Sequence, residues 1–402
     1  MRWKALSLAA LTACAATAAH AQMSDGVIKI GVMNDQSGLY ADLSGQGSVW
    51  AARKAVEDYC KTAKCEKIEI VFADHQNKPD IGSTTVRQWF DVDKVDVVVD
   101  VPTSSVALAV NNIAKEKNKV MLNSGAASSD LTGKACSPNT VHWTYDTWAL
   151  ANGTGNAIVK TGGDTWFFLT ADYAFGHALE RDTEAVVVKG GGKVVGKVRT
   201  PFPGQDFSSF LLQAQASKAK IIGLANAGGD TINSIKQAAE FGIVAGGQNL
   251  AGLLVFITDV HALSLKTAQG LIMTEAWYWD LNDANRAFAA EFEKANKGNK
   301  PTMVQAGVYS SVFHYLKAVH ELKSDADGAA VVAKMKSMPT DDALFGKGTI
   351  RADGRKVHDM YLFEVKKPSE SKGAWDYYKL RATIPAAEAF RPMSEGGCSL
   401  VK

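Results

Sequence analysis

The sequence has little excess charge and lacks the common motifs of nucleotide-binding and hydrolytic enzymes. Arg2 and Lys4 are the only charged residues among the first 21, so beyond them the 44 basic residues fall to 42, equal to the 42 acidic ones. A neutral chain lacks the basic surplus that nucleic-acid or anionic-membrane partners require. There is no P-loop and no GxSxG nucleophile elbow. Gly45 and Gly47 form a lone GxG, but Trp50 stands where a dinucleotide motif has its third glycine.

Metal-ligand spacings are absent as well. The eight histidines are scattered, and no CxxC, HExxH or paired Cys/His pattern occurs. Asp91, Asp93 and Asp96 lie close together, but without the spacing of an EF-hand. After the N-terminal segment, no stretch approaches the roughly 20 apolar residues of a membrane helix. We therefore expect no metal, no cofactor and no membrane span.

The N-terminus is typical of an exported protein. Met1–Ala21 carries Arg2 and Lys4, then an apolar run over 5–19, and ends in Ala-His-Ala. We predict a signal peptide that is cleaved after Ala21 and a mature protein in the periplasm. The alternative is a lipoprotein anchored at Cys14, for which the apolar run would be short, covering only 5–13.

Four cysteines follow this segment: Cys60, Cys65, Cys136 and Cys398. An even number in an exported chain favours disulfides over metal binding or catalysis. Cys60 and Cys65 flank a short turn, and pairing them would leave Cys136 to tie the C-terminus to mid-chain. Three connectivities are possible, and the sequence does not choose among them.

Short apolar runs alternate with helical patterns over most of the chain, which predicts an α/β fold with doubly wound parallel sheets. The expected strands are 27–32, 68–73, 95–101, 120–123, 166–170, 193–198, 221–225, 253–257 and 270–273, followed by 346–350 and 360–365. The expected helices between them are 48–59, 79–92, 104–117, 148–161, 174–189, 207–217, 230–241 and 304–322. The series is long for one sheet, so we expect two lobes. The N-terminal lobe would comprise 24–144 plus 280–351, and the C-terminal lobe 145–274 plus 352–402.

Three loops follow strands of the first sheet. The loop over 35–47 is polar and glycine-rich, the segment 102–105 is Pro-Thr-Ser-Ser, and 123–129 is Asn-Ser-Gly-Ala-Ala-Ser-Ser. Because ligands of parallel sheets bind beyond the carboxyl ends of the strands, we expect the three loops to form one site. Their hydroxyl and amide donors suit a carboxylate.

Four segments together resemble a known family: IKIGVMNDQSGLYADLSGQG, PTSSVALAV, MLNSGAASSDLTG and ADYAFGHAL. In order and spacing they are similar to periplasmic solute-binding proteins of ABC importers of the leucine/isoleucine/valine-binding type. The resemblance covers nearly the whole mature chain. It implies a type I periplasmic binding protein fold, with two α/β lobes joined by a three-segment hinge and closing on a small ligand.

The resemblance also implies which groups hold the ligand. The family's carboxylate-binding serine corresponds to Ser104, and the backbone donors correspond to Gly125 and Ala127. The partners of an ammonium group are replaced here: a threonine by Ala127, a tyrosine by Phe175, and an acidic residue by the apolar run 253–257, so that the first acid is Asp259. A buried ammonium needs acceptors or a counter-charge.

We therefore expect the ligand to be an aromatic or branched organic acid. The alternatives are a branched-chain or other apolar amino acid, or an amide or ligand sensor of the same fold. We expect a monomeric binding protein with no enzymatic activity, which delivers its ligand to the permease subunits of an ABC transporter in the inner membrane. The expected ligand-binding residues are Tyr40, Leu43, Ser104, Ser105, Ser124, Gly125, Ala126, Ala127, Tyr173, Phe175, Asn226, Ala227 and Phe256.

Overall fold

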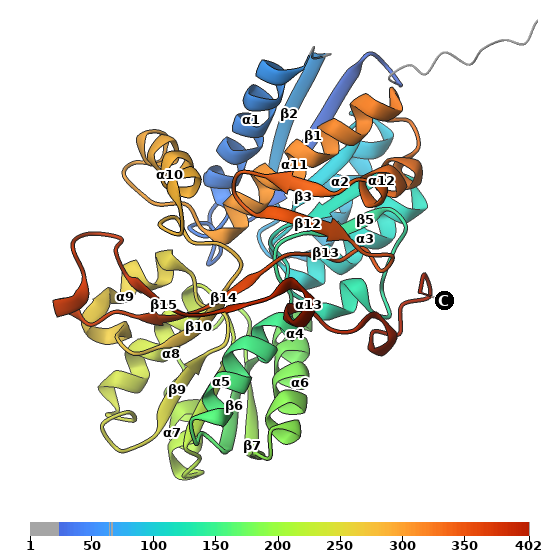
Figure 1. The fold of residues 1–402 in the computed structure, drawn as a ribbon. Helices are drawn as coiled ribbons and strands as arrows, with labels where there is room; N and C mark the ends of the chain where they lie inside the picture. The colour runs from blue at the N-terminus through green and yellow to red at the C-terminus, as the bar shows by residue number, and fades with distance from the viewer. Residues whose placement is uncertain (1–23, 64, 66, 402) are drawn as a thin grey trace, which may run out of the picture.

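A computed structural model describes residues 24–63, 65 and 67–401. It has two lobes, one above the other in Figure 1. The first lobe is built on a five-stranded parallel sheet in the order β2-β1-β3-β4-β5. Its strands are β1 (Val27–Asn34), β2 (Lys67–Asp74), β3 (Val97–Asp100), β4 (Val120–Asn123) and β5 (Thr140–His142). β3, β4 and β5 are buried throughout, as expected for strands covered on both faces.

Helices pack around this sheet. They are α1 (Gly45–Thr62), α2 (Pro79–Asp91), α3 (Ser104–Glu116), α10 (Asp283–Ala295), α11 (Met303–Leu322) and α12 (Gly328–Ser337). α1 packs against α11, and α2 against α3. Trp50 of α1 points to α10, where its ring makes edge contacts with Phe288 and Phe292. Short antiparallel strands complete the lobe: β11 (Thr340–Asp342), β12 (Gly346–Ile350) and β13 (Lys356–Val357).

The second lobe contains a four-stranded parallel sheet in the order β7-β6-β8-β9 and an antiparallel sheet in the order β10-β14-β15. The strands are β6 (Thr165–Ala171), β7 (Lys193–Thr200), β8 (Ile221–Ala225), β9 (Asn249–Gly252), β10 (Ile272–Glu275), β14 (Met360–Val365) and β15 (Tyr378–Ile384). The helices are α4 (Thr147–Leu150), α5 (Asn156–Lys160), α6 (Ala174–Lys189), α7 (Ser208–Ala216), α8 (Gly229–Glu240), α9 (Ile257–Ala268) and α13 (Ala386–Ala389).

The chain passes between the two lobes at three places. These passages follow β5, β10 and β12, and the third runs over 351–359 and includes the short strand β13. The first and third lie side by side, because His142 forms a parallel bridge with Arg355. The exact lobe boundaries given above stay a prediction.

Two of the expected elements differ from the structure. The run Leu253–Ile257 is not a strand: β9 ends at Gly252, and α9 begins at Ile257. The helix expected over 148–161 is present as one continuous helical run over 147–160, but a π-helical turn (Ala151–Gly155) separates α4 from α5. Gly153 lies at this turn, where an added Cβ would come within 2.2 Å of the Thr274 hydroxyl, so this helix approaches β10 closely.

The disulfides are Cys60–Cys65 and Cys136–Cys398. The predicted signal peptide, 1–21, and Cys14 lie outside the described residues. Within the described part of the chain, no helix is long and apolar enough to cross a membrane. The same residues include no group of three or more His, Cys, Asp or Glu side chains that could hold a metal ion.

Candidate ligand-binding site

A small cavity of about 10 Å³ lies between the lobes, at the carboxyl ends of the strands. Eight of the expected ligand-binding residues line it: Tyr40, Leu43, Gly125, Ala127, Tyr173, Phe175, Ala227 and Phe256. Sequence reasoning missed three others, Pro102, Tyr145 and Leu254. Pro102 belongs to the predicted segment 102–105 and could have been included. Tyr145 and Leu254 gave no such signal, because Tyr145 is the first residue after a predicted lobe boundary and Leu254 was assigned to a strand.

The end of β3 shapes the first-lobe wall of the cavity. Asp100 and Val101 have positive φ angles of 80° and 51°, which are strained for residues other than glycine. The turn is held by the Asp100 carbonyl, which accepts hydrogen bonds from the N–H groups of Ser124 (3.2 Å) and Gly125 (3.1 Å). At Gly125 an added Cβ would lie 2.6 Å from Cα of Pro102. Only glycine therefore allows this close approach of the two loops.

The ligand loop, residues 123–128, leaves few donors free. The N–H of Gly125 is bonded to Asp100, and the N–H of Ala126 to Oδ1 of Asn123 at 3.1 Å. Ala127 N–H has no hydrogen-bond partner among the residues described. Ser104 is fully buried, and its Oγ accepts from the N–H of Ser128 at 3.2 Å, which leaves its own hydroxyl hydrogen to donate. Ser104 and Ala127 are thus the donors that this loop can offer to a carboxylate.

Five of the expected ligand-binding residues do not line the cavity: Ser104, Ser105, Ser124, Ala126 and Asn226. Ser104 lies just behind the lining, next to the ligand loop. The Ser124 hydroxyl is 3.4 Å from that of Ser311 in α11. The Asn226 side chain is held within the second lobe, since it donates to Ser234 (3.0 Å) and accepts from Thr231 (2.7 Å). The backbone of Ala126 is also bonded within the first lobe.

Aromatic side chains from both lobes close the cavity. The hydroxyl oxygen of Tyr40, in the first lobe, lies 2.5 Å from that of Tyr173, in the second. The Tyr173 ring stacks on Phe202 with a centroid distance of 3.8 Å. Burial raises the pKa of both tyrosines, so both hydroxyls stay protonated. This contact joins the two lobes directly at the cavity wall.

None of the described residues that line the cavity has a charged side chain. Asp259, the first acid after the apolar run, lies in the first turn of α9 and accepts from the N–H of Phe256, the residue before this helix, at 2.9 Å. Asp230 is only 2% exposed, and its Oδ1 accepts from the N–H of Gly204 at 3.1 Å, while Oδ2 has no partner among the residues described. Burial raises the pKa of each carboxyl to about 7. Neither acid provides a lining group for an ammonium.

A model of the family described as periplasmic binding protein matches residues 27–374. The chain belongs to this family. It is 53% identical to a periplasmic binding protein from Burkholderia mallei, with a TM-score of 0.91 over 94% of this chain and 100% of the other. It is 40% identical to a branched chain amino acid ABC transporter periplasmic ligand-binding protein from Burkholderia xenovorans, with a TM-score of 0.82 over 93% and 100% of the two chains.

A solute binding protein of an ABC transporter from Rhodopseudomonas palustris, in complex with benzoate, is 23% identical. Its TM-score is 0.81, over 93% of this chain and 100% of the other, and at this identity it shows the fold alone. These findings confirm the family and the type I fold predicted from the sequence. The chain is a periplasmic solute-binding protein of the ABC-transporter class.

Proposed function

We propose that this protein captures a small organic carboxylate, aromatic or branched, between its two lobes. The observation that carries the proposal is the composition of the cavity, whose eleven described lining residues are uncharged and largely apolar, five of them aromatic. Ala127, whose N–H has no partner among the residues described, is one of the lining residues, and the Ser104 hydroxyl contacts the same loop at Ser128. Neutral donors can hold a carboxylate, and aromatic walls suit an apolar body. An ammonium group would be buried there without a counter-charge, which is costly.

A branched-chain or other apolar amino acid is the second candidate. It is favoured by the 40% identical relative from Burkholderia xenovorans, whose name specifies branched-chain amino acids. The proposal places the ligand in the same cavity in either case. The difference lies in whether the ligand carries an ammonium group.

In the proposed mechanism the ligand bridges the lobes and shifts the population toward the closed form. The closed form would then be read by the permease subunits of an ABC transporter in the inner membrane, with a monomeric binding protein in the periplasm. The proposed lobes are 24–144 plus 280–351 and 145–274 plus 352–402. Because three passages connect them, a hinge motion between lobes is the expected movement.

A thermal-shift screen of benzoate, cinnamate, branched aliphatic acids, leucine and valine tests the ligand class. A ligand that binds only the folded protein adds about 2.7 kcal/mol at 100 times its Kd, which a melt resolves easily. We expect carboxylates without an ammonium group to raise Tm. If leucine or valine raises Tm and the plain acids do not, the amino-acid candidate is correct and the proposal is wrong.

Replacing Ser104 with alanine tests the carboxylate end. The variant removes the donor and also the acceptor of the Ser128 N–H, so we expect affinity for the best acid of the screen to fall about tenfold, the size of a hydrogen bond to a charged group. Titration calorimetry measures this loss. Ser105→Ala is the matched control, because Ser104 bonds to the ligand loop at Ser128, whereas the Ser105 hydroxyl makes no hydrogen bond to that loop among the residues described. Equal affinities of the two variants would remove Ser104 from the site.

A further inference from the structure

The passage from β5 to α4 lies directly behind the ligand loop. Residues 142–147 donate hydrogen bonds to four of its carbonyl oxygens. The bonds run from His142 Nε2 to Ala126 (2.8 Å), from Trp143 N to Asn123 (2.7 Å), from Tyr145 Oη to Gly125 (2.6 Å) and from Thr147 N to Ala127 (2.8 Å). Burial holds the pKa of His142 well below its usual range, so this imidazole is neutral and its Nε2 carries the donated hydrogen. The conformation of the ligand loop is therefore set from this passage.

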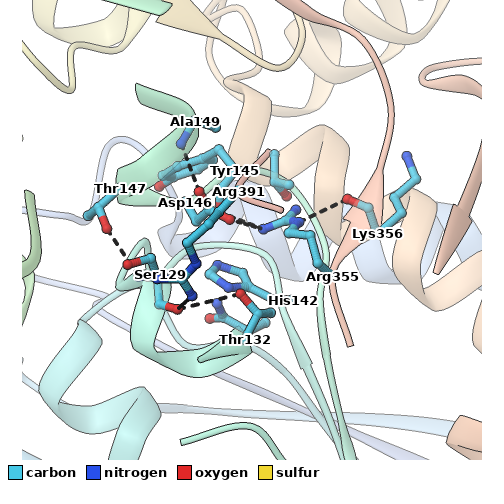
Figure 2. Close-up of polar contacts among 12 residues, drawn as sticks. Ser129, Thr132, His142, Tyr145, Asp146, Thr147, Ala149, Arg355, Lys356 and Arg391 are labelled. Carbon is cyan, nitrogen blue, oxygen red and sulfur yellow. Dashed lines mark hydrogen bonds and ion pairs between the residues drawn. The ribbon is translucent and has the colours of Figure 1, made fainter. Parts of the chain in front are cut away.

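The third passage between lobes holds the first one in turn. The carbonyl of Gly354 accepts from the His142 N–H at 2.9 Å, and Nη1 of Arg355 donates to the Tyr145 carbonyl at 2.9 Å. Figure 2 shows the Arg355 guanidinium beside Tyr145 and Asp146, with Asp146 Oδ2 3.5 Å from Nη1. The ligand loop and two of the three hinge segments thus form one hydrogen-bonded unit.

Tyr145 occupies the central place in this unit. Its ring lines the cavity and makes an edge contact with Phe256 of the second lobe at 6.2 Å between centroids. Its hydroxyl holds Gly125, and its carbonyl is held by Arg355. We propose that Tyr145 is a positioning residue: through Gly125 it fixes the ligand loop in the conformation that binds the ligand, and it links that loop to the hinge. The effect of Tyr145 on ligand binding rests on the proposed function, whereas its effect on the conformation of the ligand loop does not.

The substitution Tyr145→Phe keeps the ring and removes the hydroxyl. The Gly125 carbonyl then loses a buried donor, which corresponds to a loss of about 2- to 12-fold in the population of the fixed loop. Tyr315→Phe is the matched control, since Tyr315 in α11 is fully buried and its hydroxyl has no partner among the residues described. Both variants lose one buried hydroxyl, but only one of these hydroxyls contacts the ligand loop.

Hydrogen–deuterium exchange of the ligand-free proteins measures how well ordered the ligand loop is without any ligand. We expect the amides of residues 125–128 to exchange faster in Tyr145→Phe than in wild type, and at the wild-type rate in Tyr315→Phe. Titration with benzoate and with leucine then measures binding in the same three proteins. For whichever probe binds wild type, we expect about fivefold weaker binding by Tyr145→Phe and unchanged binding by Tyr315→Phe.

Each outcome separates the two proposals. Unchanged exchange at residues 125–128 in Tyr145→Phe overturns the positioning role. Faster exchange with unchanged affinity also overturns the positioning role, because ligand binding would then not depend on the order that Tyr145 gives to the loop. If wild type binds neither probe, the proposed ligand class fails, and the exchange rates alone decide whether Tyr145 positions the loop.

Discussion

Removal of the Cys136–Cys398 disulfide should destabilise the protein far more than removal of Cys60–Cys65. The two bonds close chain segments of very different length, 262 against 5 residues. In the chain-entropy model, a crosslink restricts the unfolded state by an amount that grows with the logarithm of the loop length. The model gives about 5.5 kcal/mol for the long loop and about 2 kcal/mol for the short one at 25 °C.

Native contacts of the C-terminal strap, residues 385–401, add to this difference. The strap leaves β15 in the second lobe and ends at Cys398, which is bonded to Cys136 in the connection between β4 and β5 of the first lobe. On the way Nη2 of Arg391 donates to the Ser129 carbonyl at 2.9 Å, and the Arg391 carbonyl accepts from Nη1 of Arg351 at 2.8 Å. Together with the three passages, the strap and its disulfide therefore form a fourth connection between the two lobes.

Urea unfolding of two double variants, Cys136→Ser with Cys398→Ser and Cys60→Ser with Cys65→Ser, tests the estimate. Both are measured without ligand and without reductant, so that each keeps the other disulfide. We expect the first pair to lower the free energy of unfolding by at least twice as much as the second. If the local pair costs as much as the long-range one, loop length does not govern these bonds and the reasoning is refuted.

Two further predictions concern buried charges. Asp230→Asn should raise Tm at pH 8 and make Tm depend less on pH. The Asp230 carboxyl has a pKa of about 7 in the folded protein and an ordinary value near 4, so the folded state binds its proton more tightly. Ionising this carboxyl therefore destabilises the fold as pH rises from about 4 to 7, by up to about 4 kcal/mol. An equal pH dependence in melts of wild type and variant would contradict this. Arg355→Met should lower the free energy of unfolding by about 3–5 kcal/mol, because it leaves the buried Asp146 carboxylate without its ion-pair partner. Lys356→Met should raise it at pH 7, because the Lys356 ammonium is buried without a hydrogen-bond partner in the described chain and its pKa falls to about 7. If Arg355→Met and Lys356→Met change the free energy of unfolding in urea in the same direction, this difference between the paired and the unpaired cation is refuted.

The parallel sheets were predictable because their strands are short, continuous apolar runs. β4 and β8, for example, lie where the sequence placed them, and both are buried along their whole length. β5 was missed, because its Thr-Val-His sequence has one apolar residue and gives no such run. The edge strand β15 was missed for a related reason: most of its residues are exposed. Strands that bury little apolar surface leave a weak pattern.

The predicted ligand-binding residues divide by how directly the sequence places them. Gly125 and Ala127 follow a recognisable strand and match a family motif, and both line the cavity. Tyr145 lies directly after a predicted lobe boundary, and the sequence gives it no role in the site. Its place at the ligand loop depends on hydrogen bonds to Gly125 and from Arg355, which is 210 residues away in the sequence. Local pattern does not encode contacts of that range.

The apolar run at 253–257 shows how a correct observation led to a wrong element. Leu254 and Phe256 are almost fully buried, which the pattern predicted, but no sheet covers them. β9 ends at Gly252, and the next four residues run along the cavity before α9 begins at Ile257. Leu254 and Phe256 line the cavity together with residues of the first lobe, and the Phe256 ring contacts Tyr145. The apolar residues that were predicted to form a strand therefore give the second-lobe wall of the cavity its uncharged surface. If a Leu254→Ala variant binds every acid and amino acid tested with unchanged affinity, this wall does not contribute to binding.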